Sequence, residues 1–477
     1  MLSILVCHSY FMRFDAKQRE RAKPYPPLAT LQVASALRSA GHSVQVFDAM
    51  LADGEHEFDR MVRAQRPHLV LLYEDNYNFL SKMCLARMRE AACRMIGTAR
   101  AEGARVIASG SDASDSPEPY LQAGAEVVLR GEGLTALFEL IPRLDADRSA
   151  ASEEWVAGLH GAVIMSSGTK AHSNGAPPPA SAQQPELPAW DLIDIERYRQ
   201  VWRQAHGFFS LNMAASRGCP FRCTWCAKPI WGNQYLQRSP AIVAAEMAYL
   251  KSFFRPDHIW FADDIFGFRV DWVMDFAMAL RSLKASIPFT IQTRADLISE
   301  RMAHALALAG CKEAWLGAES GSQKVLDAMN KGTTVPQILT ARARLKAAGI
   351  RVGFFIQLGY IGEELQDIIA TRELISAARP DDIGVSVSYP LPGTPFYDKV
   401  RAQLSDKTRW QDSADLAMMF RGTYTSEFYR EVRNLLHDQV SQQAAPDALE
   451  AEERRWQDLL ARAAQYRSRD SSTSLLG

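Results

Sequence analysis

Residues 216–226 read SRGCPFRCTWC and place Cys219, Cys223 and Cys226 in one short loop. Their C-x3-C-x2-C spacing lets three thiolates bind three irons of a cubane cluster, while the fourth iron keeps no protein ligand. An iron without a protein ligand can bind a substrate group, as at other catalytic metal sites. A structural zinc site is the alternative interpretation. Such a site usually takes four Cys or His ligands in paired spacings, and no fourth ligand lies close in sequence. The loop therefore favours an iron–sulfur cluster with one open iron.

Short apolar segments alternate with helix-length amphipathic segments around and after this loop. The alternation is typical of α/β proteins with parallel sheets. Six strand–helix units are too few for a closed eight-stranded barrel, so we expect a partial (β/α)6 barrel with its functional groups at the carboxyl ends of the strands. The strands are expected at Phe208–Ala215, His258–Ala262, Phe289–Gln292, Glu313–Ala318, Val352–Leu358 and Ile383–Tyr389.

A second α/β pattern runs ahead of the loop, from Met1 to about Leu144. One of its helices is expected at Leu28–Ala40, opened by Pro26-Pro27 and closed by Gly41. Five strands with intervening helices predict a doubly wound, Rossmann-like parallel sheet, which binds ligands beyond the carboxyl ends of its strands. These strands are expected at Ser3–Cys7, Ser43–Phe47, Leu69–Tyr73, Arg105–Ser109 and Glu126–Arg130.

These patterns divide the chain into four parts. We expect a Rossmann-like domain, a connecting segment, a partial barrel and a helical C-terminal extension, at residues 1–145, 146–190, 191–396 and 397–477. In the connecting segment, Leu159–Met165 predicts a small hairpin strand. Ser166–Pro188 is rich in Ser, Ala, Gly, Pro and Gln, and predicts a flexible loop. The polar C-terminal part predicts a solvated extension or a cap over the substrate.

Bulk composition excludes several classes of protein. The 477 residues are 47% hydrophobic and 23% charged, as in ordinary globular proteins, and the net charge of −1 favours neither nucleic acid nor an anionic membrane as a partner. No apolar run reaches the roughly 20 residues that a membrane span needs. The first residues lack the basic region of a signal peptide. Seven cysteines in no disulfide pattern indicate a reducing, cytoplasmic compartment.

The cysteine loop resembles the motif of the radical SAM superfamily, C-x3-C-x-aromatic-C, with Trp225 in the aromatic position. The resemblance extends from about Phe208 to Pro395. It implies a [4Fe-4S] cluster whose open iron is chelated by S-adenosylmethionine (SAM). One electron, from a flavodoxin- or ferredoxin-type donor, would then split SAM into methionine and a 5′-deoxyadenosyl radical that abstracts hydrogen from a small-molecule substrate.

The same resemblance assigns residues at the next two strand ends to SAM. Asp263 and Asp264 end the second strand, where the superfamily holds the amino group of SAM, and carboxylates are suitable acceptors for an ammonium group. A helix N-cap is the alternative role for this pair. Arg294 ends the third strand and would face the SAM carboxylate, or else form a surface ion pair.

Two further segments resemble SAM-contacting parts of the superfamily. Gly317–Gly321, which contains Glu319 and Ser320, resembles the segment that contacts the ribose, and a tight turn is its alternative role. Gly353–Glu363 resembles the segment that packs along adenine. Its glycines would equally serve packing between strand and loop.

The N-terminal part resembles the cobalamin-binding domain that precedes many radical SAM domains. Two segments carry this resemblance, SGSD at 109–112 and EVVLRGEG at 126–133, both at expected strand ends. Small residues there let the backbone approach a corrin ring or its nucleotide tail. A scaffold that has lost cobalamin is the alternative. The resemblance assigns cobalamin contacts to Ser109, Gly110, Gly131, Glu132 and Gly133.

The chain departs from many cobalamin domains after its first strand. Those domains carry Asp-x-His-x-x-Gly, which supplies histidine as the lower ligand of cobalt, whereas this chain reads CHSY at 7–10. We therefore interpret His8 as an ordinary histidine at a strand end. The candidates for the lower face of the corrin are Tyr73, Glu74 and Asn76, after the third strand.

The combined resemblance predicts a cobalamin-dependent radical SAM methyltransferase that acts on an unactivated carbon, or on phosphorus, of a small metabolite. A non-methylating oxidoreductase or cyclase of the same architecture, similar to anaerobic magnesium-protoporphyrin ester cyclase, is the alternative. A redox-sensing or partner-binding metal protein gains little from an open iron. Methylthiotransferases usually carry extra cluster cysteines ahead of the triad, whereas Cys84 and Cys93 here are typical of a core.

Overall fold

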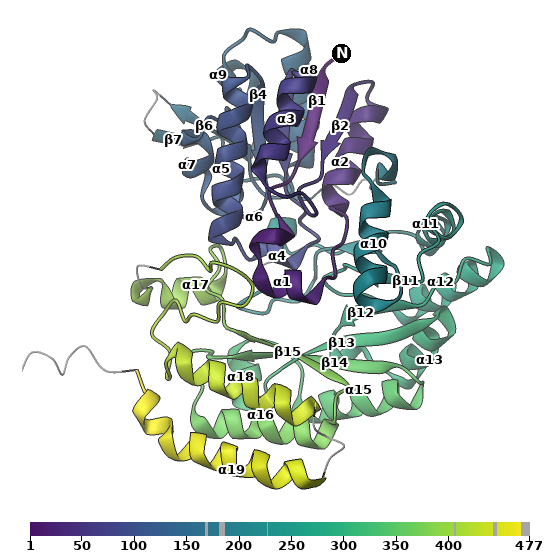
Figure 1. The fold of residues 1–477 in the computed structure, drawn as a ribbon, viewed down its shortest axis with the longest axis vertical. Coiled ribbons are helices and arrows are strands. Elements are labelled where there is room, and N and C mark those ends of the chain that lie inside the picture. Colours follow the sequence, from purple (N-terminus) through teal and green to yellow (C-terminus); the bar gives the residue numbers. More distant parts are fainter. Residues whose placement is uncertain (167–169, 181–186, 227, 405–406, 442–445, 469–477) are drawn as a thin grey trace, which may run out of the picture. The chain divides into compact units, whose positions relative to one another are not determined.

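The structure is a computed structural model that describes residues 1–166, 170–180, 187–226, 228–404, 407–441 and 446–468 (Figure 1). The chain divides into two compact units, which are described separately. Unit 1 comprises Met1–Pro220, Ala227–Asp264 and Arg409–Asp415, and unit 2 comprises Phe221–Cys226, Ile265–Thr408 and Leu416–Gly477. The chain therefore passes from one unit to the other five times.

Unit 1 is built on a seven-stranded sheet in the order β2-β1-β3-β4-β5-β6-β7. Strands β1 to β5 are parallel, and β6 and β7 are antiparallel additions at one edge. Strands β1 and β3 are almost entirely apolar, as expected of parallel strands buried on both faces. The bounds are Ser3–Cys7 (β1), Ser43–Phe47 (β2), Leu69–Tyr73 (β3), Arg105–Ser109 (β4), Val127–Leu129 (β5), Ala162–Ser166 (β6) and Lys170–Ser173 (β7).

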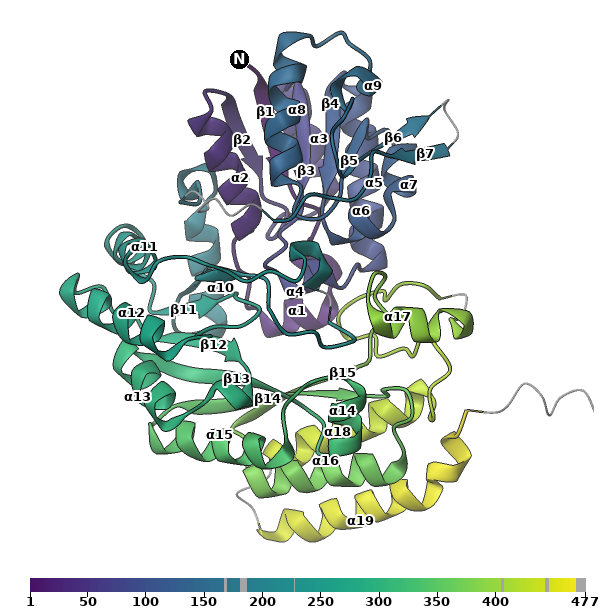
Figure 2. The same cartoon turned by 180° about the vertical axis from the view of Figure 1, so that it is seen from behind.

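Helices cover both faces of this sheet. Buried side chains of α3, α5 and α7 join those of the strands in one hydrophobic core, and α8 lies on the opposite face (Figures 1 and 2). The doubly wound sheet predicted for this part is confirmed. The helices of unit 1 are Ala16–Arg21 (α1), Leu28–Ser39 (α2), Glu55–Gln65 (α3), Phe79–Lys82 (α4), Ala86–Ala101 (α5), Ser111–Asp115 (α6), Pro117–Gln122 (α7), Leu134–Ala146 (α8), Ser152–Trp155 (α9), Ile195–His206 (α10) and Pro240–Phe253 (α11).

The connecting segment differs from its prediction. The hairpin strand expected near Leu159–Met165 is confirmed as β6, but the flexible loop expected at Ser166–Pro188 is wrong in part, because it contains β7. β7 pairs with β6 from Val163↔Ser173 to Ser166↔Lys170, so backbone hydrogen bonds order a polar segment that has little to bury. Residues 167–169 and 181–186 lie outside the described residues.

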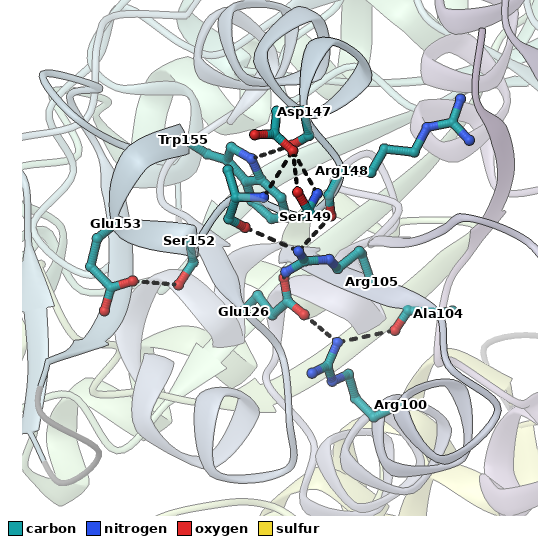
Figure 3. A network of polar contacts seen from close by, with 11 residues as sticks. Arg100, Ala104, Arg105, Glu126, Asp147, Arg148, Ser149, Ser152, Glu153 and Trp155 are labelled. Atoms are coloured by element: carbon teal, nitrogen blue, oxygen red, sulfur yellow. Dashed lines mark hydrogen bonds and ion pairs between the residues drawn. The ribbon is translucent and has the colours of Figure 1, made fainter.

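A polar network joins the segments before β4 and β5, at the amino edge of the unit 1 sheet (Figure 3). Arg105 binds Glu126 at 2.6 Å and donates to the carbonyl oxygens of Arg148 and Ala150 at 2.6 and 3.0 Å. Its guanidinium lies 4.3 Å from the ring centroid of Trp155, and Arg100 binds the same Glu126. These contacts are internal to the fold, and the residues predicted to bind cofactors lie at the carboxyl edge.

The second sheet has six strands in the order β15-β14-β13-β12-β11-β8. The pairing of β8 with β11 in unit 1 is parallel, and so are the pairings that join β12 to β15 in unit 2. Six parallel strands with intervening helices confirm the predicted partial barrel. The strand bounds are Ser210–Met213 (β8), His258–Phe261 (β11), Phe289–Thr293 (β12), Cys311–Glu319 (β13), Arg351–Leu358 (β14) and Asp382–Val387 (β15).

The C-terminal part is helical, as predicted. Helix α18 packs against β15 and α16, so it covers the last strand of the sheet, and α19 packs against α18 (Figure 2). No helix in the described ranges combines the length and apolarity that a membrane crossing needs. The helices of unit 2 are Val270–Ser282 (α12), Glu300–Ala309 (α13), Gln323–Ala328 (α14), Val335–Ala347 (α15), Leu365–Ala378 (α16), Pro395–Val400 (α17), Ser426–Ser441 (α18) and Pro446–Arg462 (α19).

Candidate functional site

The cysteine loop begins in unit 1 with a backbone conformation that only glycine accommodates. Ser216–Arg217 (β9) pairs antiparallel with Leu236–Gln237 (β10). Gly218 follows with φ +74°, and a Cβ atom there would lie 2.3 Å from the carbonyl oxygen of Gln234. A side chain at position 218 would therefore collide with backbone, as well as occupying a left-handed conformation. The glycine fixes the direction in which the chain approaches Cys219.

Asp263 holds the start of this loop. Its buried carboxylate accepts hydrogen bonds from the Ala215 amide at 3.0 Å and from the Ser216 hydroxyl at 2.5 Å. Burial raises the pKa of Asp263 to about 7. The alternative role of a helix N-cap is not what the structure shows, because α12 begins at Val270 behind Arg269. Asp263 thus joins the end of β11 to the segment that carries the first cysteine.

Asp264 has a different partner. One of its carboxylate oxygens lies 2.6 Å from the Lys82 ammonium group, and the side chains are 19% and 7% exposed, respectively. Lys82 is the last residue of α4, in the segment after β3. The two adjacent aspartates are therefore separated in function: one binds the cysteine loop and the other a buried lysine.

Glu132, predicted to contact cobalamin, also holds the cysteine loop. Its carboxylate forms a buried ion pair with Arg217, two residues before Cys219. The Glu132 carbonyl oxygen accepts a hydrogen bond from the Tyr73 hydroxyl at 2.6 Å. Buried ion pairs of this kind fix geometry more reliably than they add stability. The loop after β5 and the start of the cysteine loop are thereby held together within unit 1.

The other residues predicted for cobalamin are packed tightly where β4 and β5 end. A Cβ atom on Gly133 would lie 2.6 Å from the Ser109 hydroxyl oxygen, and one on Gly110 would lie 2.7 Å from Cβ and Cγ of Glu74. The Gly131 amide donates to the Ser114 hydroxyl at 3.0 Å. Within the described residues, the buried Ser109 hydroxyl has no hydrogen-bond partner. Such a group is unfavourable unless a ligand or water satisfies it.

The three candidates for the lower corrin face differ in their contacts. The Tyr73 hydroxyl is bound to Glu132, and the Glu74 carboxylate accepts from the Ser9 amide at 3.1 Å and the Ser9 hydroxyl at 2.5 Å. Burial raises the pKa of Glu74 to about 7. In contrast, both amide atoms of the fully buried Asn76 lack a partner among the described residues. Asn76 is therefore the candidate with unused hydrogen-bonding groups.

His8 has the structural role predicted for it. Its buried Nε2 lies 3.0 Å from an oxygen of Asp48. The pKa of His8 is raised because the nearby carboxylates, chiefly Asp48, outweigh the opposing effect of its burial. The ring is thus held by a carboxylate at the strand end.

The rest of the cysteine loop, Phe221–Cys226, belongs to unit 2 and is held at Thr224. The Thr224 amide donates to the Met329 carbonyl at 2.9 Å, and its hydroxyl lies 2.7 Å from the Tyr360 hydroxyl. The Phe396 amide donates to the Thr224 carbonyl at 3.0 Å. Thr224, which directly follows Cys223, is therefore bound through all of its polar groups.

Trp225 gives the loop a hydrophobic anchor. It packs against a core cluster at the ends of α14 and β14 and around α17, formed by Val325, Met329, Tyr360, Phe396, Val400 and Phe420. This packing explains why an aromatic residue suits the position before the third cysteine. A small residue there would leave a cavity beneath the loop.

Arg294, at the end of β12, lies against this loop rather than at the surface. It is buried, and its Nη1 atom donates to the Cys223 sulfur at 3.7 Å. The guanidinium also lies 3.7 Å from the ring centroid of Phe221. On its other side, Arg294 forms an ion pair with Asp296 at 2.9 Å. The surface ion pair considered as an alternative is thus replaced by a buried one.

Glu319, at the end of β13, is aimed by an irregularity in the strand. The register against β14 shifts between Gly317↔Phe355 and Glu319↔Ile356, and Glu319 has φ +60°. Bulges of this kind re-aim side chains and are common beside active sites. The Glu319 carboxylate binds the Lys331 ammonium group at 2.6 Å, and both side chains are buried. Burial acts to lower the pKa of Lys331, but the attraction and hydrogen bond of Glu319, together with the charge of Cys223, outweigh it, so the pKa is raised.

The next residues form the tight turn that the sequence allowed as an alternative. The buried Ser320 hydroxyl bonds the Thr371 hydroxyl at 3.1 Å and accepts from the Ser322 amide at 3.1 Å. A Cβ atom on Gly321 would lie 2.1 Å from the Ala370 carbonyl oxygen, so α16 packs directly on the turn. In β14, a Cβ on Gly353 would meet the Trp315 ring at 2.5 Å. These glycines serve close packing.

All three loop cysteines are partly exposed, whereas Cys7, Cys84 and Cys311 are buried. In the part of the chain that the structure describes, no three Cys, His, Asp or Glu side chains are close enough together to hold a metal ion. The ligation of a cluster by Cys219, Cys223 and Cys226 therefore stays a prediction.

Several residues of the site were not predicted from the sequence. Lys331, Tyr360 and Lys82 each bind a predicted site residue or the cysteine loop, and Arg217, within the cysteine-loop segment, binds the predicted site residue Glu132. No local sequence pattern pairs these residues with their partners, because each contact is created by tertiary packing.

Comparison with known proteins gives one family and several relatives. Residues 213–375 match the sequence model of the radical SAM superfamily. A Pyrococcus horikoshii protein named as an uncharacterized methyltransferase is 23% identical over 378 residues, which cover 78% of each chain. The anaerobic magnesium-protoporphyrin IX monomethyl ester cyclase of Cereibacter sphaeroides is 26% identical over 284 residues, covering 58% of this chain and 45% of the cyclase. The chain thus spans less than half the length of that cyclase.

A solved structure shares the fold of most of the chain. It is the radical S-adenosylmethionine methyltransferase TsrM from Kitasatospora setae, with cobalamin and a [4Fe-4S] cluster bound. The TM-score is 0.68 at 19% sequence identity, and the match covers 84% of this chain and 75% of TsrM. At this identity the likeness is one of fold, and it agrees with the doubly wound sheet followed by a partial barrel.

Proposed function

Because residues 213–375 form a radical SAM domain, we propose that this chain is a cobalamin-dependent methyltransferase that acts on an unactivated carbon, or on phosphorus, of a small metabolite. The observation that carries the proposal is the order of parts: a doubly wound sheet precedes a radical SAM domain with a three-cysteine loop. In this proposal residues 1–145 bind cobalamin and residues 191–396 generate the radical. A flavodoxin- or ferredoxin-type protein supplies the electron.

The cysteine loop fits a [4Fe-4S] cluster by the chemistry of its donors. Three thiolates suit iron, and the segments around Cys219 and Cys223 are fixed by a buried ion pair at Arg217 and a partly buried hydrogen bond at Thr224. Such support orients metal ligands before the metal binds. When bound, the cluster supplies the electron that cleaves SAM, so that a hydrogen atom can be removed from the substrate. The chain itself orients the thiolates and, through Trp225, packs the loop against an apolar core.

SAM is proposed to contact Asp264 and Glu319. Each carboxylate pairs with a buried lysine, Lys82 or Lys331, through a single oxygen. A carboxylate can accept several hydrogen bonds, so each retains capacity toward an ammonium or ribose hydroxyl group. In this scheme Asp263 and Ser320 act as positioning residues, because their polar atoms are buried in contacts with Ser216 and Thr371.

Unsatisfied polar groups support cobalamin binding by unit 1. Among the described residues, the Ser109 hydroxyl, both amide atoms of Asn76 and the Tyr77 hydroxyl are buried without a partner. Asn76 and Tyr77 follow β3, and Ser109 is the last residue of β4; the carboxyl ends of these strands lie on the edge where doubly wound sheets bind ligands. A corrin carries amide side chains that can satisfy such groups. When bound, cobalamin supplies the methyl group that is transferred.

A non-methylating enzyme remains the second candidate, supported by the relative that is a magnesium-protoporphyrin ester cyclase. The two candidates make different products from SAM. A methyltransferase forms S-adenosylhomocysteine in addition to 5′-deoxyadenosine, whereas the alternative forms 5′-deoxyadenosine alone.

The first test measures iron and cobalt per chain after anaerobic reconstitution with iron, sulfide and hydroxocobalamin. We expect about four irons, as in a [4Fe-4S] cluster, and about one cobalt. Cys223→Ser should lower the iron content, and Cys93→Ser, a partly exposed cysteine on α5, is the matched control. Four irons without cobalt would remove cobalamin from the proposal. SAM products formed by the loaded, reduced enzyme then separate the two candidates.

A further inference from the structure

The buried guanidinium of Arg294 donates to one of the proposed cluster ligands, Cys223. Its Nη1 atom lies 3.7 Å from the Cys223 sulfur, within the range of an N–H···S hydrogen bond. Phe221, two residues before Cys223, stacks on the guanidinium with its ring centroid at 3.7 Å. The side chain is only 6% exposed. A positive charge on a side chain that is itself shielded from water thus lies against the sulfur.

The remaining edge of the guanidinium is occupied by protein. Nε and Nη2 donate to the two carboxylate oxygens of Asp296 at 2.9 and 3.0 Å. Nη2 also donates to the Lys331 carbonyl at 2.6 Å and to the Thr333 hydroxyl at 3.0 Å. The fork that would bind a ligand carboxylate with two hydrogen bonds is therefore already used by Asp296. Nη1, the atom that remains, is directed at sulfur.

We propose that Arg294 is a positioning residue that raises the reduction potential of the cluster by donating a hydrogen bond to the Cys223 thiolate, in place of the predicted contact with the SAM carboxylate. This inference rests on the proposed function, because it requires the cluster to be bound. Reduction adds one negative charge to the cluster and its thiolates. A fixed cation that donates to a ligand sulfur stabilises the reduced form more than the oxidised form. The effect is strong where the surroundings exclude water.

Asp296 has the opposite effect on the proposed reduction potential. Its carboxylate compensates part of the Arg294 charge, and its side chain is 17% exposed. If the charge of Arg294 raises the reduction potential, then neutralising Asp296 removes the compensating negative charge and raises the potential further. Removing the charge of Arg294 lowers it. A purely structural role for Arg294 does not predict opposite signs for the two substitutions.

The test is an EPR-monitored redox titration of the reconstituted full-length protein, in the absence of SAM. We compare wild type with Arg294→Gln, Arg294→Lys and Asp296→Asn. Arg301→Gln is the control, because Arg301 forms an exposed ion pair with Asp271 on another helix. At a fixed potential, Arg294→Gln should lower the ratio of reduced to oxidised cluster about tenfold, a shift of about 59 mV for one electron. Arg294→Lys should lower it less, and Asp296→Asn should raise it.

Each outcome decides the matter. Arg294→Gln with full iron content and a wild-type potential overturns the inference. A separate measurement of SAM binding to that variant, if it shows weakened binding, would then return Arg294 to the SAM carboxylate. If Arg294→Gln fails to take up iron, Asp296→Asn decides alone, because a lowered or unchanged potential contradicts the proposal. A wild-type protein that takes up no four-iron cluster overturns the proposed function and this inference together.

Discussion

Glu74 is a buried acid whose charge is disfavoured in the folded protein. Burial raises its pKa to about 7, from an ordinary value of 4.5. The folded state therefore binds a proton that the unfolded state releases, so this contribution to stability is present below about pH 4.5 and is lost as the pH rises through about 7. Glu74→Gln stays neutral and keeps an oxygen for Ser9.

We expect Glu74→Gln to gain roughly 2–3 kcal/mol in unfolding free energy relative to wild type between pH 5 and pH 8. Urea unfolding of the cofactor-free protein at several pH values measures this difference. Glu139→Gln, an exposed acid on α8, is the control and should leave the pH dependence unchanged. Parallel pH profiles for wild type and Glu74→Gln would show that Glu74 is ionised in the folded protein.

The Glu319–Lys331 pair is a second test at this scale. Both side chains are buried: Lys331 is 7% exposed and Glu319 is 5% exposed. Lys331→Met leaves an unpaired buried carboxylate and should cost about 3–5 kcal/mol of unfolding free energy. The double variant Lys331→Met with Glu319→Gln should recover part of this loss. Lys324→Met, which breaks a pair whose lysine is 59% exposed, should cost less than about 1 kcal/mol. Equal losses in the two single variants would contradict this account.

Local sequence patterns identified the cysteine triad as a candidate cluster loop and predicted that Arg294 and Glu319 lie at strand ends. Their partners could not be predicted. Arg294 and Cys223 are 71 residues apart in sequence, and no local pattern links them. The sequence left Asp263 between a SAM contact and a helix cap, whereas its partners are Ala215 and Ser216, 48 and 47 residues away. These contacts depend on the order of the strands in the sheet, which cannot be read from local sequence patterns.

Among the elements, the cysteine loop depends most on one glycine. Gly218 and Gly349 have nearly the same φ, +74° and +73°, but a Cβ atom at 218 would collide with backbone while one at 349 meets nothing within 4 Å. Gly349→Ala therefore reports the cost of the conformation alone. We expect Gly218→Ala to lose most of its iron after reconstitution, with far-UV circular dichroism close to that of wild type. Iron contents that match between the two variants would show that the collision is unimportant.

Strands were predicted better than the segment that joins the two sheets. The strands β1 to β4 consist mainly of apolar residues, and their predicted limits agree with the structure. β7 reads KAHS, which has no apolar alternation to signal a strand. It is ordered by pairing with β6 at the sheet edge. Edge strands of this kind depend on a neighbouring strand rather than on their own composition.

At the scale of the whole molecule, the segment Arg409–Asp415 completes unit 1 from the C-terminal end of the chain. Trp410 is buried, and its carbonyl oxygen accepts from the Ala86 amide at 2.8 Å. The Ser413 hydroxyl donates to Asp15 at 2.9 Å. Removing the indole leaves a cavity in unit 1, so Trp410→Ala should cost about 3–5 kcal/mol.

Native-state hydrogen exchange would locate this loss. Exchange should accelerate in the α1 and α5 regions of unit 1, which contact the segment, and stay unchanged in β13 and β14. Arg301→Gln, which removes an exposed ion pair, is again the control and should leave exchange in unit 1 unchanged. Acceleration that is equal in both units would mean that the segment does not belong to unit 1 alone.

The five passages of the chain between the units also constrain how such a protein can diversify. Each unit is encoded by three separate stretches of the gene. A recombination event that moves one contiguous stretch carries only part of either unit, so the fragment arrives without strands or segments that complete its core. Exchange of a whole unit between relatives would therefore require three separate stretches of the chain to be replaced together. Any chimera intended to alter substrate choice should accordingly replace surface loops and leave the five crossing points intact.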